Sequence, residues 1–156
     1  MYEITIQRMV VAKSLPATVK FKRWATTVLK NKMPSAELTI RIVDKNEMIE
    51  LNSTYRHKNK PTNVLSFPLD MPIEQNETIP LLGDIIICAD VVSEEAVEQD
   101  KSLEAHWAHM VVHGTLHLLG YDHEQDSDAE IMEAEEINVL AELGFGNPYC
   151  VKGEKQ

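Results

Sequence analysis

The chain has 156 residues, 44% hydrophobic and 26% charged, with a formal net charge of −10. A chain of this length is expected to form one domain, residues 1–156, whose core needs no disulfide framework. The longest uncharged apolar run, Ile85–Ala89, is far too short to cross a bilayer, and residues 1–11 lack the apolar core of a signal peptide. Two cysteines, Cys88 and Cys150, fit free thiols in a reducing compartment. We therefore expect a cytoplasmic protein with no membrane partner.

The charge is unevenly distributed along the chain. Residues 1–60 contain 12 Lys and Arg against 5 Asp and Glu, a local charge of +7, whereas residues 61–156 contain 3 against 20, a local charge of −17. Such asymmetry indicates a basic face and an acidic face, and the basic face would suit a polyanion. The alternative is two solvated surfaces without a partner, which charge alone favours.

The first half of the chain predicts two strands and two helices. Alternating β-branched residues predict strands over Glu3–Val11 and Glu37–Val43. Asp44 precedes Glu47 by three residues, a capping-box pattern that predicts a helix over Lys45–Tyr55. A further helix, starting near Pro16 and ending near Lys30, would bury a stripe made of Val19, Trp24, Val28 and Leu29.

The second half predicts mainly helices. A basic loop, Arg56–Asn63, leads into a short strand over Val64–Phe67, and Leu81–Cys88 has the composition of a buried central strand. The segment Asp70–Thr78 is expected to be a loop. Three helices should follow: one reaching Gln99 with Asp90 or Ser93 as its cap, one over Leu103–Leu119, and an acidic one over Ser127–Leu143 ended by Gly144. With strands mostly early and helices mostly late, the fold class is α+β.

The most informative segment is H-G-T-L-H-L-L-G-Y-D-H, residues 113–123. Its histidines, at i, i+4 and i+10 with a glycine three residues before the last, have a spacing similar to the metzincin signature H-E-x-x-H-x-x-G-x-x-H. Gly114 stands where those proteases keep their general-base glutamate. We predict that His113, His117 and His123 bind one Zn²⁺ per chain, leaving an open position as in catalytic zinc sites.

Helix geometry supports this choice. His113 and His117 would share one helix face about 6 Å apart along the axis, and Gly120 could end the helix so that His123 turns back toward them. His109 and His113 form a competing i, i+4 pair. We expect His109 to be a neighbour of the metal centre or a cleft residue that contacts substrate, and His106 to be a surface or packing residue.

The acidic residues beside and after the motif can have a functional role or a purely structural one. Asp122 could orient an imidazole, act as a base, or simply form a turn. The acidic helix that carries Glu130, Glu133, Glu135 and Glu136 is expected to be mostly a solvated face.

The motif HGTLHLLGYDH closely resembles the signature of the YbeY family, bacterial rRNA-maturation factors described as metal-dependent endoribonucleases. LNSTYRHKNKPTNVLSFP resembles the basic loop and strand of that family, and LLGDIIIC resembles its next strand. The resemblance extends from about Glu37 to Tyr149. Two positions depart from the family: Asn63 stands where Asp is usual, and His57 where Gly is common.

The resemblance implies an α+β fold with a small mixed sheet, several helices and a metzincin-like metal site on a long helix. It implies zinc at the three histidines and a functional Arg56 in the cleft, where Lys58 and Lys60 would hold neighbouring phosphates. The substrate would be single-stranded rRNA, cleaved during 16S rRNA 3′-end maturation and ribosome quality control. Small-subunit ribosomal proteins and an assembly GTPase would be partners. The alternatives are an assembly factor with a structural metal, and a divergent metallohydrolase or peptidase.

Overall fold

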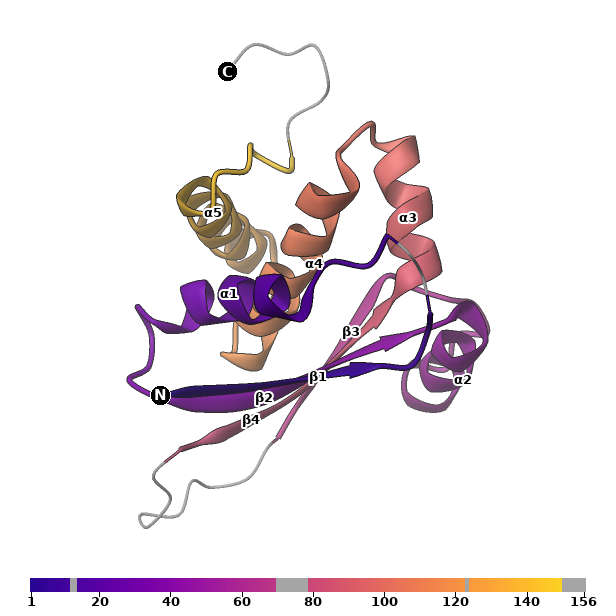
Figure 1. Ribbon diagram of the computed structural model, residues 1–156, viewed down its shortest axis with the longest axis horizontal. Coiled ribbons are helices and arrows are strands. Elements are labelled where there is room, and N and C mark those ends of the chain that lie inside the picture. The colour runs from indigo at the N-terminus through magenta and orange to yellow at the C-terminus, as the bar shows by residue number, and fades with distance from the viewer. Residues whose placement is uncertain (12–13, 70–78, 123, 150–156) are drawn as a thin grey trace.

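The computed structural model describes residues 1–11, 14–69, 79–122 and 124–149. Within them one four-stranded sheet is surrounded by five helices (Figure 1). The strands are β1 (Tyr2–Arg8), β2 (Ala36–Val43), β3 (Val64–Pro68) and β4 (Leu81–Cys88). The helices are α1 (Thr18–Leu29), α2 (Lys45–Arg56), α3 (Ala89–Glu98), α4 (Leu103–Leu118) and α5 (Asp126–Glu142). The predicted loop 70–78, the histidine His123, Cys150 and the tail that follows it lie outside the described residues.

The sheet is mixed, in the order β1-β2-β4-β3. β1, β2 and β4 are parallel, and β3 runs antiparallel to β4. β4 is therefore an interior strand, as its apolar composition predicted, and Ile85–Cys88 is buried. The α+β class and the small mixed sheet are confirmed. β3 has β4 as its sheet partner and forms an edge of the sheet, and this edge borders the cleft described below.

Figure 1 shows α1, α4 and α5 together on one side of the sheet, with α2 apart from them. The larger core lies under α1 and α4, where Phe21 packs edge-on against Trp24 and Trp107 with ring centroids 5.6 and 5.5 Å apart. The predicted stripe of α1 was wrong at Val19, which is 70% exposed. The helix turns Phe21 inward instead, because Phe21, Trp24, Ala25, Val28 and Leu29 share one face at helical spacing.

A smaller core on the other side of the sheet holds α2 through Met48, which packs with Val43, Leu65, Ile86 and Cys88. The predicted N-cap is confirmed: the Asp44 carboxylate accepts a hydrogen bond from the Glu47 backbone N–H at 2.9 Å. The Glu47 carboxylate instead pairs with Arg41 at 2.7 Å.

Most boundaries agree with the prediction to within two residues, but the end of β1 and the predicted cap of α3 were wrong. β1 ends at Arg8 rather than Val11. α3 begins at Ala89, directly after β4, so neither Asp90 nor Ser93 is its cap. Asp90 lies in the first turn and accepts a hydrogen bond from the Lys45 backbone N–H at 3.3 Å, which ties α3 to the start of α2.

The helix that carries the histidine motif, α4, is buried along most of its length. Its end confirms the predicted role of Gly120, which has φ +100°. The Gly120 N–H binds the His117 carbonyl at 3.0 Å and the Tyr121 N–H binds the Leu116 carbonyl at 3.1 Å, a Schellman motif. The chain therefore turns sharply after the two helical histidines. No helix in the described part of the chain is both long and apolar enough to cross a membrane.

Gly114 lies where α4 comes close to the sheet. A Cβ atom built at this position would lie 2.6 Å from Cγ2 of Ile85 on β4. Ser66 of β3 also donates its hydroxyl to the Gly114 carbonyl at 3.2 Å. The residue that replaces the protease glutamate thus faces the sheet, and a larger side chain there would push α4 away from it.

We predict that Gly114→Ala destabilises the protein by about 1–3 kcal/mol, because the added methyl group overpacks the contact with Ile85. In an Ile85→Ala background the clash is removed, so Gly114→Ala should be neutral, or stabilising by up to about 1 kcal/mol through its helix propensity. Urea denaturation of wild type, the two single variants and the double variant gives the coupling energy between Gly114→Ala and Ile85→Ala. Equal costs of Gly114→Ala in both backgrounds would contradict the packing argument.

Candidate metal centre and cleft

A cleft of about 630 Å³ opens between the end of α4 and the segment that joins α2 to β3. It brings together the predicted site residues Arg56, Lys58, Lys60, His113 and His117, which come from separate parts of the chain. The other residues that line it are Asn52, Thr62, Asn63, Val64, Leu65, Ser66, Pro68, Gly120, Tyr121, Asp122 and Glu124.

One wall of the cleft is basic. Arg56 is the last residue of α2, and Lys58 and Lys60 lie on the loop that follows, all three exposed. His57 adopts a left-handed conformation, φ +58°, that ends the helix. The side chain of Asn52, which is 2% exposed, donates to the Lys60 carbonyl at 2.8 Å. Sequence reasoning missed Asn52, whose one signal was an amide in the middle of a helix. It fixes the loop that carries the cations.

The cleft is also lined by carboxylates. Asp122 and Glu124 both line it beyond the turn at Gly120. The Asp122 carboxylate accepts a hydrogen bond from the Glu124 N–H at 3.1 Å, which is the turn-forming role that the sequence left open for it. The lining of the cleft therefore contains both basic and acidic side chains.

His113 and His117 face one another at this end of α4. Their Nε2 atoms are 3.2 Å apart. Two nitrogens that bind one tetrahedral zinc ion at its usual bond length are separated by about 3.3 Å. The two side chains are thus already placed for a shared ion, with both residues lining the cleft.

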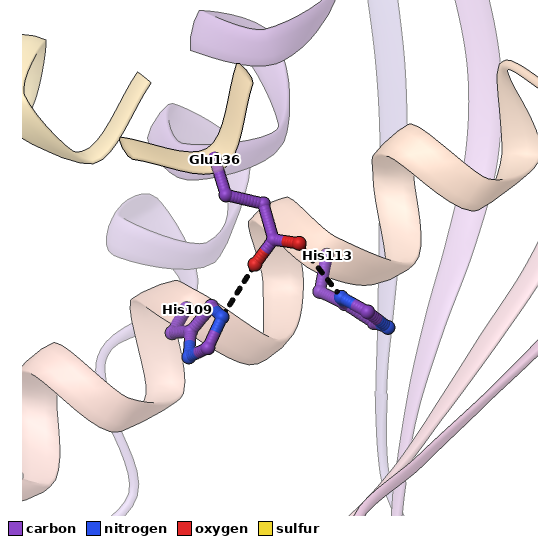
Figure 2. A group of neighbouring side chains, drawn as sticks. All are labelled: His109, His113 and Glu136. Carbon is purple, nitrogen blue, oxygen red and sulfur yellow. Dashed lines mark hydrogen bonds and ion pairs between the residues drawn. The ribbon is translucent and has the colours of Figure 1, made fainter. Parts of the chain in front are cut away.

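A buried carboxylate lies behind His113. Figure 2 shows Glu136 of α5 between His109 and His113, with the far nitrogen of the His113 ring pointing away from it. Glu136 Oε1 is 3.1 Å from His113 Nδ1, and Oε2 is 2.5 Å from His109 Nε2. Burial raises the pKa of Glu136, but the hydrogen bonds from His109 and His113 outweigh burial and lower its pKa to about 2. Glu136 is therefore ionised although its side chain is 1% exposed.

Among the described residues, His109, His113 and Glu136 form a candidate metal-binding group, since their ligand atoms all lie within 4.8 Å of one another. His109 is 7% exposed and lies behind His113, not among the residues that line the cleft. Two arrangements thus share His113: this trio, and the pair with His117.

The prediction of a solvated acidic helix was wrong at Glu136. The carboxylates of Glu130, Glu133 and Glu135 remain at least partly exposed, but Glu136 is fully buried. The available signal was its position on the buried face of α5, which also carries Met132, Val139 and Leu140. A carboxylate on a buried helix face needs donors from elsewhere in the chain.

The charge asymmetry of the chain is partly resolved by internal pairing. Lysines of the basic half meet glutamates of the acidic half in four ion pairs: Lys20–Glu104, Lys30–Glu142, Lys32–Glu135 and Lys45–Glu94. Such exposed pairs contribute little to stability. These pairs neutralise positive charge in and just after α1 and at the start of α2. A larger share of the positive charge of the basic half therefore lies on the loop with Lys58 and Lys60.

Asn63, which departs from the family pattern, contacts Glu95 of α3. Its amide nitrogen lies 3.1 and 3.3 Å from the two carboxylate oxygens. Glu95 also accepts from Nε2 of His106, 2.8 Å away, and His106 is 2% exposed. His106 is thus a buried packing residue, and burial lowers its pKa although Glu95 opposes the shift. The amide at position 63 suits a neighbour that is already negative.

We predict that Asn63→Asp destabilises the protein by about 1 kcal/mol at pH 7.5, because it places two carboxylates in contact. In the folded state one of the two groups would keep its proton to a higher pH than in the unfolded chain. The penalty is therefore present at neutral pH and disappears as the pH falls below about 4. Thermal unfolding of wild type, Asn63→Asp and the uncharged control Asn63→Ala, measured between pH 7.5 and pH 4, gives this penalty. If the stability difference between Asn63→Asp and wild type does not change with pH, the prediction is contradicted.

Two comparisons place this architecture among known proteins. The solution structure of TM1509 from Thermotoga maritima is similar over 100% of both chains, with a TM-score of 0.59 and 26% sequence identity. The sequence model of the family described as Endoribonuclease YbeY matches residues 8–144. That range contains the last residue of β1, the other three strands, all five helices and every cleft residue named above. The chain belongs to the endoribonuclease YbeY family.

Proposed function

We propose that the protein is a zinc-dependent, single-strand-specific endoribonuclease that acts in 16S rRNA 3′-end maturation and in ribosome quality control. Membership of an endoribonuclease family makes RNA the substrate class. The observation that supports the proposal is that Arg56, Lys58 and Lys60 line the same cleft as His113 and His117. A polyanion that follows the basic wall would pass over the two imidazoles.

The proposed zinc ligands are His113, His117 and His123. The first two have the separation that a tetrahedral ion requires. His123 lies outside the described residues, and its support is its place in the motif, three residues after the turn at Gly120. When bound, zinc would supply Lewis-acid activation of water and of a phosphoryl oxygen at neutral pH.

Arg56 would stabilise the charge that develops on the non-bridging oxygens during phosphodiester cleavage. Its guanidinium stays protonated and matches the geometry of a phosphate. Lys58 and Lys60 would hold neighbouring phosphates as point charges. Gly114 stands where the proteases keep their general-base glutamate. It packs against Ile85, which leaves no room for a carboxylate side chain at this position. Both facts argue against peptide hydrolysis.

The partners follow from the same proposal. Single-stranded rRNA would be the substrate, and small-subunit ribosomal proteins and an assembly GTPase would present it in the cytoplasm. The amide of Asn52, bound to the Lys60 carbonyl, would keep the basic loop in place while the RNA enters.

The test is cleavage of a single-stranded rRNA fragment by wild type, His117→Ala and Arg56→Glu, with zinc measured on each preparation. We expect His117→Ala to lose both metal and activity. Arg56→Glu should keep its metal and lose at least about 100-fold in rate, as when one transition-state donor is removed. Arg23→Glu, an exposed charge reversal on α1, is the matched control and should cleave normally.

The same fragment annealed to its complement should resist cleavage. Equal activity in wild type, His117→Ala and Arg56→Glu would show that the nuclease activity does not arise at this site. The protein would then be an assembly factor with a structural metal.

We predict a further, ionic signature of binding. The slope of log affinity against log salt for single-stranded RNA should become shallower by about 0.7 for each of Lys58→Gln and Lys60→Gln, because each removes one phosphate contact. Fluorescence anisotropy at several salt concentrations measures the slope. Lys30→Gln, which removes a lysine that pairs with Glu142 and does not line the cleft, should leave the slope unchanged. Identical slopes for all three variants would remove the basic loop from the binding surface.

A further inference from the structure

We propose that Glu136 is a positioning residue for the metal centre: it holds the His113 ring from behind, and is not itself a metal ligand. In this arrangement His109 and Tyr149 hold Glu136 in turn. The inference rests on the zinc site of the proposed function. It assigns the trio His109, His113 and Glu136 to the support of that site instead of to a separate site.

The two ring nitrogens of His113 contact different residues. Nδ1 faces the Glu136 carboxylate at 3.1 Å, and Nε2 faces His117 Nε2 at 3.2 Å. Because a carboxylate oxygen accepts hydrogen bonds, this contact assigns the ring proton to Nδ1. The lone pair then lies on Nε2 and points toward His117 and the cleft, which is the nitrogen a metal in the cleft would use.

Both oxygens of the Glu136 carboxylate accept hydrogen bonds without an ion. Oε1 accepts from His113, and Oε2 accepts from His109 Nε2 at 2.5 Å and from the Tyr149 hydroxyl at 2.8 Å. A metal bound to either oxygen would compete with these donors. Their arrangement therefore favours a supporting role over direct ligation.

His109 is placed to donate a hydrogen bond to Glu136 from its Nε2 atom. Its Nδ1 has no hydrogen-bond partner among the described residues and is buried. A proton on that nitrogen would be a buried donor without an acceptor, whereas a bare lone pair costs less. The proton therefore sits on Nε2, where it is donated to Glu136.

Tyr149 supplies the third donor from the C-terminal end of the described chain. Burial and the Glu136 charge raise the pKa of its hydroxyl, so the group keeps its proton and donates. Its ring also packs edge-on against His109, with centroids 5.4 Å apart. Tyr149 is 43% exposed and belongs to neither hydrophobic core, so Tyr149→Phe removes this donor while keeping the ring.

A carboxylate in this position fixes the tautomer and the orientation of the ligand ring and raises its basicity. Loss of such a partner typically weakens metal affinity about 10–100-fold. We expect a loss in this range for Glu136→Gln and a smaller loss for Tyr149→Phe. Glu95→Gln is the matched control: it alters a second histidine–carboxylate pair, between Glu95 of α3 and His106 of α4, which does not include His113. It should bind zinc as wild type does.

Three readouts on the purified full chain test the assignment. Competition with a chromophoric chelator gives zinc affinity. The visible spectrum of the Co²⁺-substituted protein reports the ligand set, which should be the same in Glu136→Gln as in wild type. Long-range ¹⁵N–¹H spectra of the metal-free protein report the His113 tautomer, which should be Nδ1–H in wild type and mixed in Glu136→Gln.

Wild-type zinc affinity in Glu136→Gln, in a preparation series where His117→Ala loses zinc, would overturn the inference and leave the proposed function intact. A Co²⁺ spectrum that indicates one ligand fewer in Glu136→Gln than in wild type would also overturn the inference, because it would make Glu136 a metal ligand. Retention of zinc by His117→Ala would instead refute the proposed zinc site. Should Glu136→Gln fail to fold, Tyr149→Phe decides: unchanged affinity and tautomer would count against the inference.

Discussion

The position of α4 between the sheet and α5 is the constraint on which the rest of the structure depends. Gly114 lets the helix approach β4 so closely that a Cβ atom would collide with Ile85. With that contact made, the 100° step of the helix places His113 and His117 toward the cleft and His109 toward Glu136. One helix thus serves the core, the cleft and the buried carboxylate at once. A shift of α4 would disturb all three together.

Glu136 shows why that arrangement can tolerate a buried charge. An ionised carboxylate taken from water is costly unless donors replace the solvent. Here three donors converge on it, from His109, His113 and Tyr149, and its pKa falls to about 2 although burial acts the other way. Replacing the group by an apolar side chain could be tolerated for folding alone. A charged residue at this buried position is easier to understand if the carboxylate serves the imidazole that it contacts.

The cleft also explains how an acidic chain can bind RNA. Four lysines of the basic half are paired with glutamates, among them Lys32 with Glu135, so the surplus of positive charge is not spread over one face. Arg56, Lys58 and Lys60 concentrate it on one wall of the cleft. Asp122 and Glu124 also line the cleft and would repel a phosphate backbone that came close to them. The two sets of charges together would favour a path for the strand along the basic residues.

What could be foreseen from the sequence follows the distance over which each signal acts. The Asp44 cap and the Gly120 turn depend on neighbours within five positions, and both were predicted correctly. The order of the strands and the partner of His113 depend on segments far apart; 23 positions separate His113 from Glu136. The charge of Glu136 suggested solvent, while its place on the buried face of α5 indicated the opposite. Position was the better guide, because a helix presents the same face along its length whatever residue type occupies it, and a charged residue that faces inward must meet its partners there.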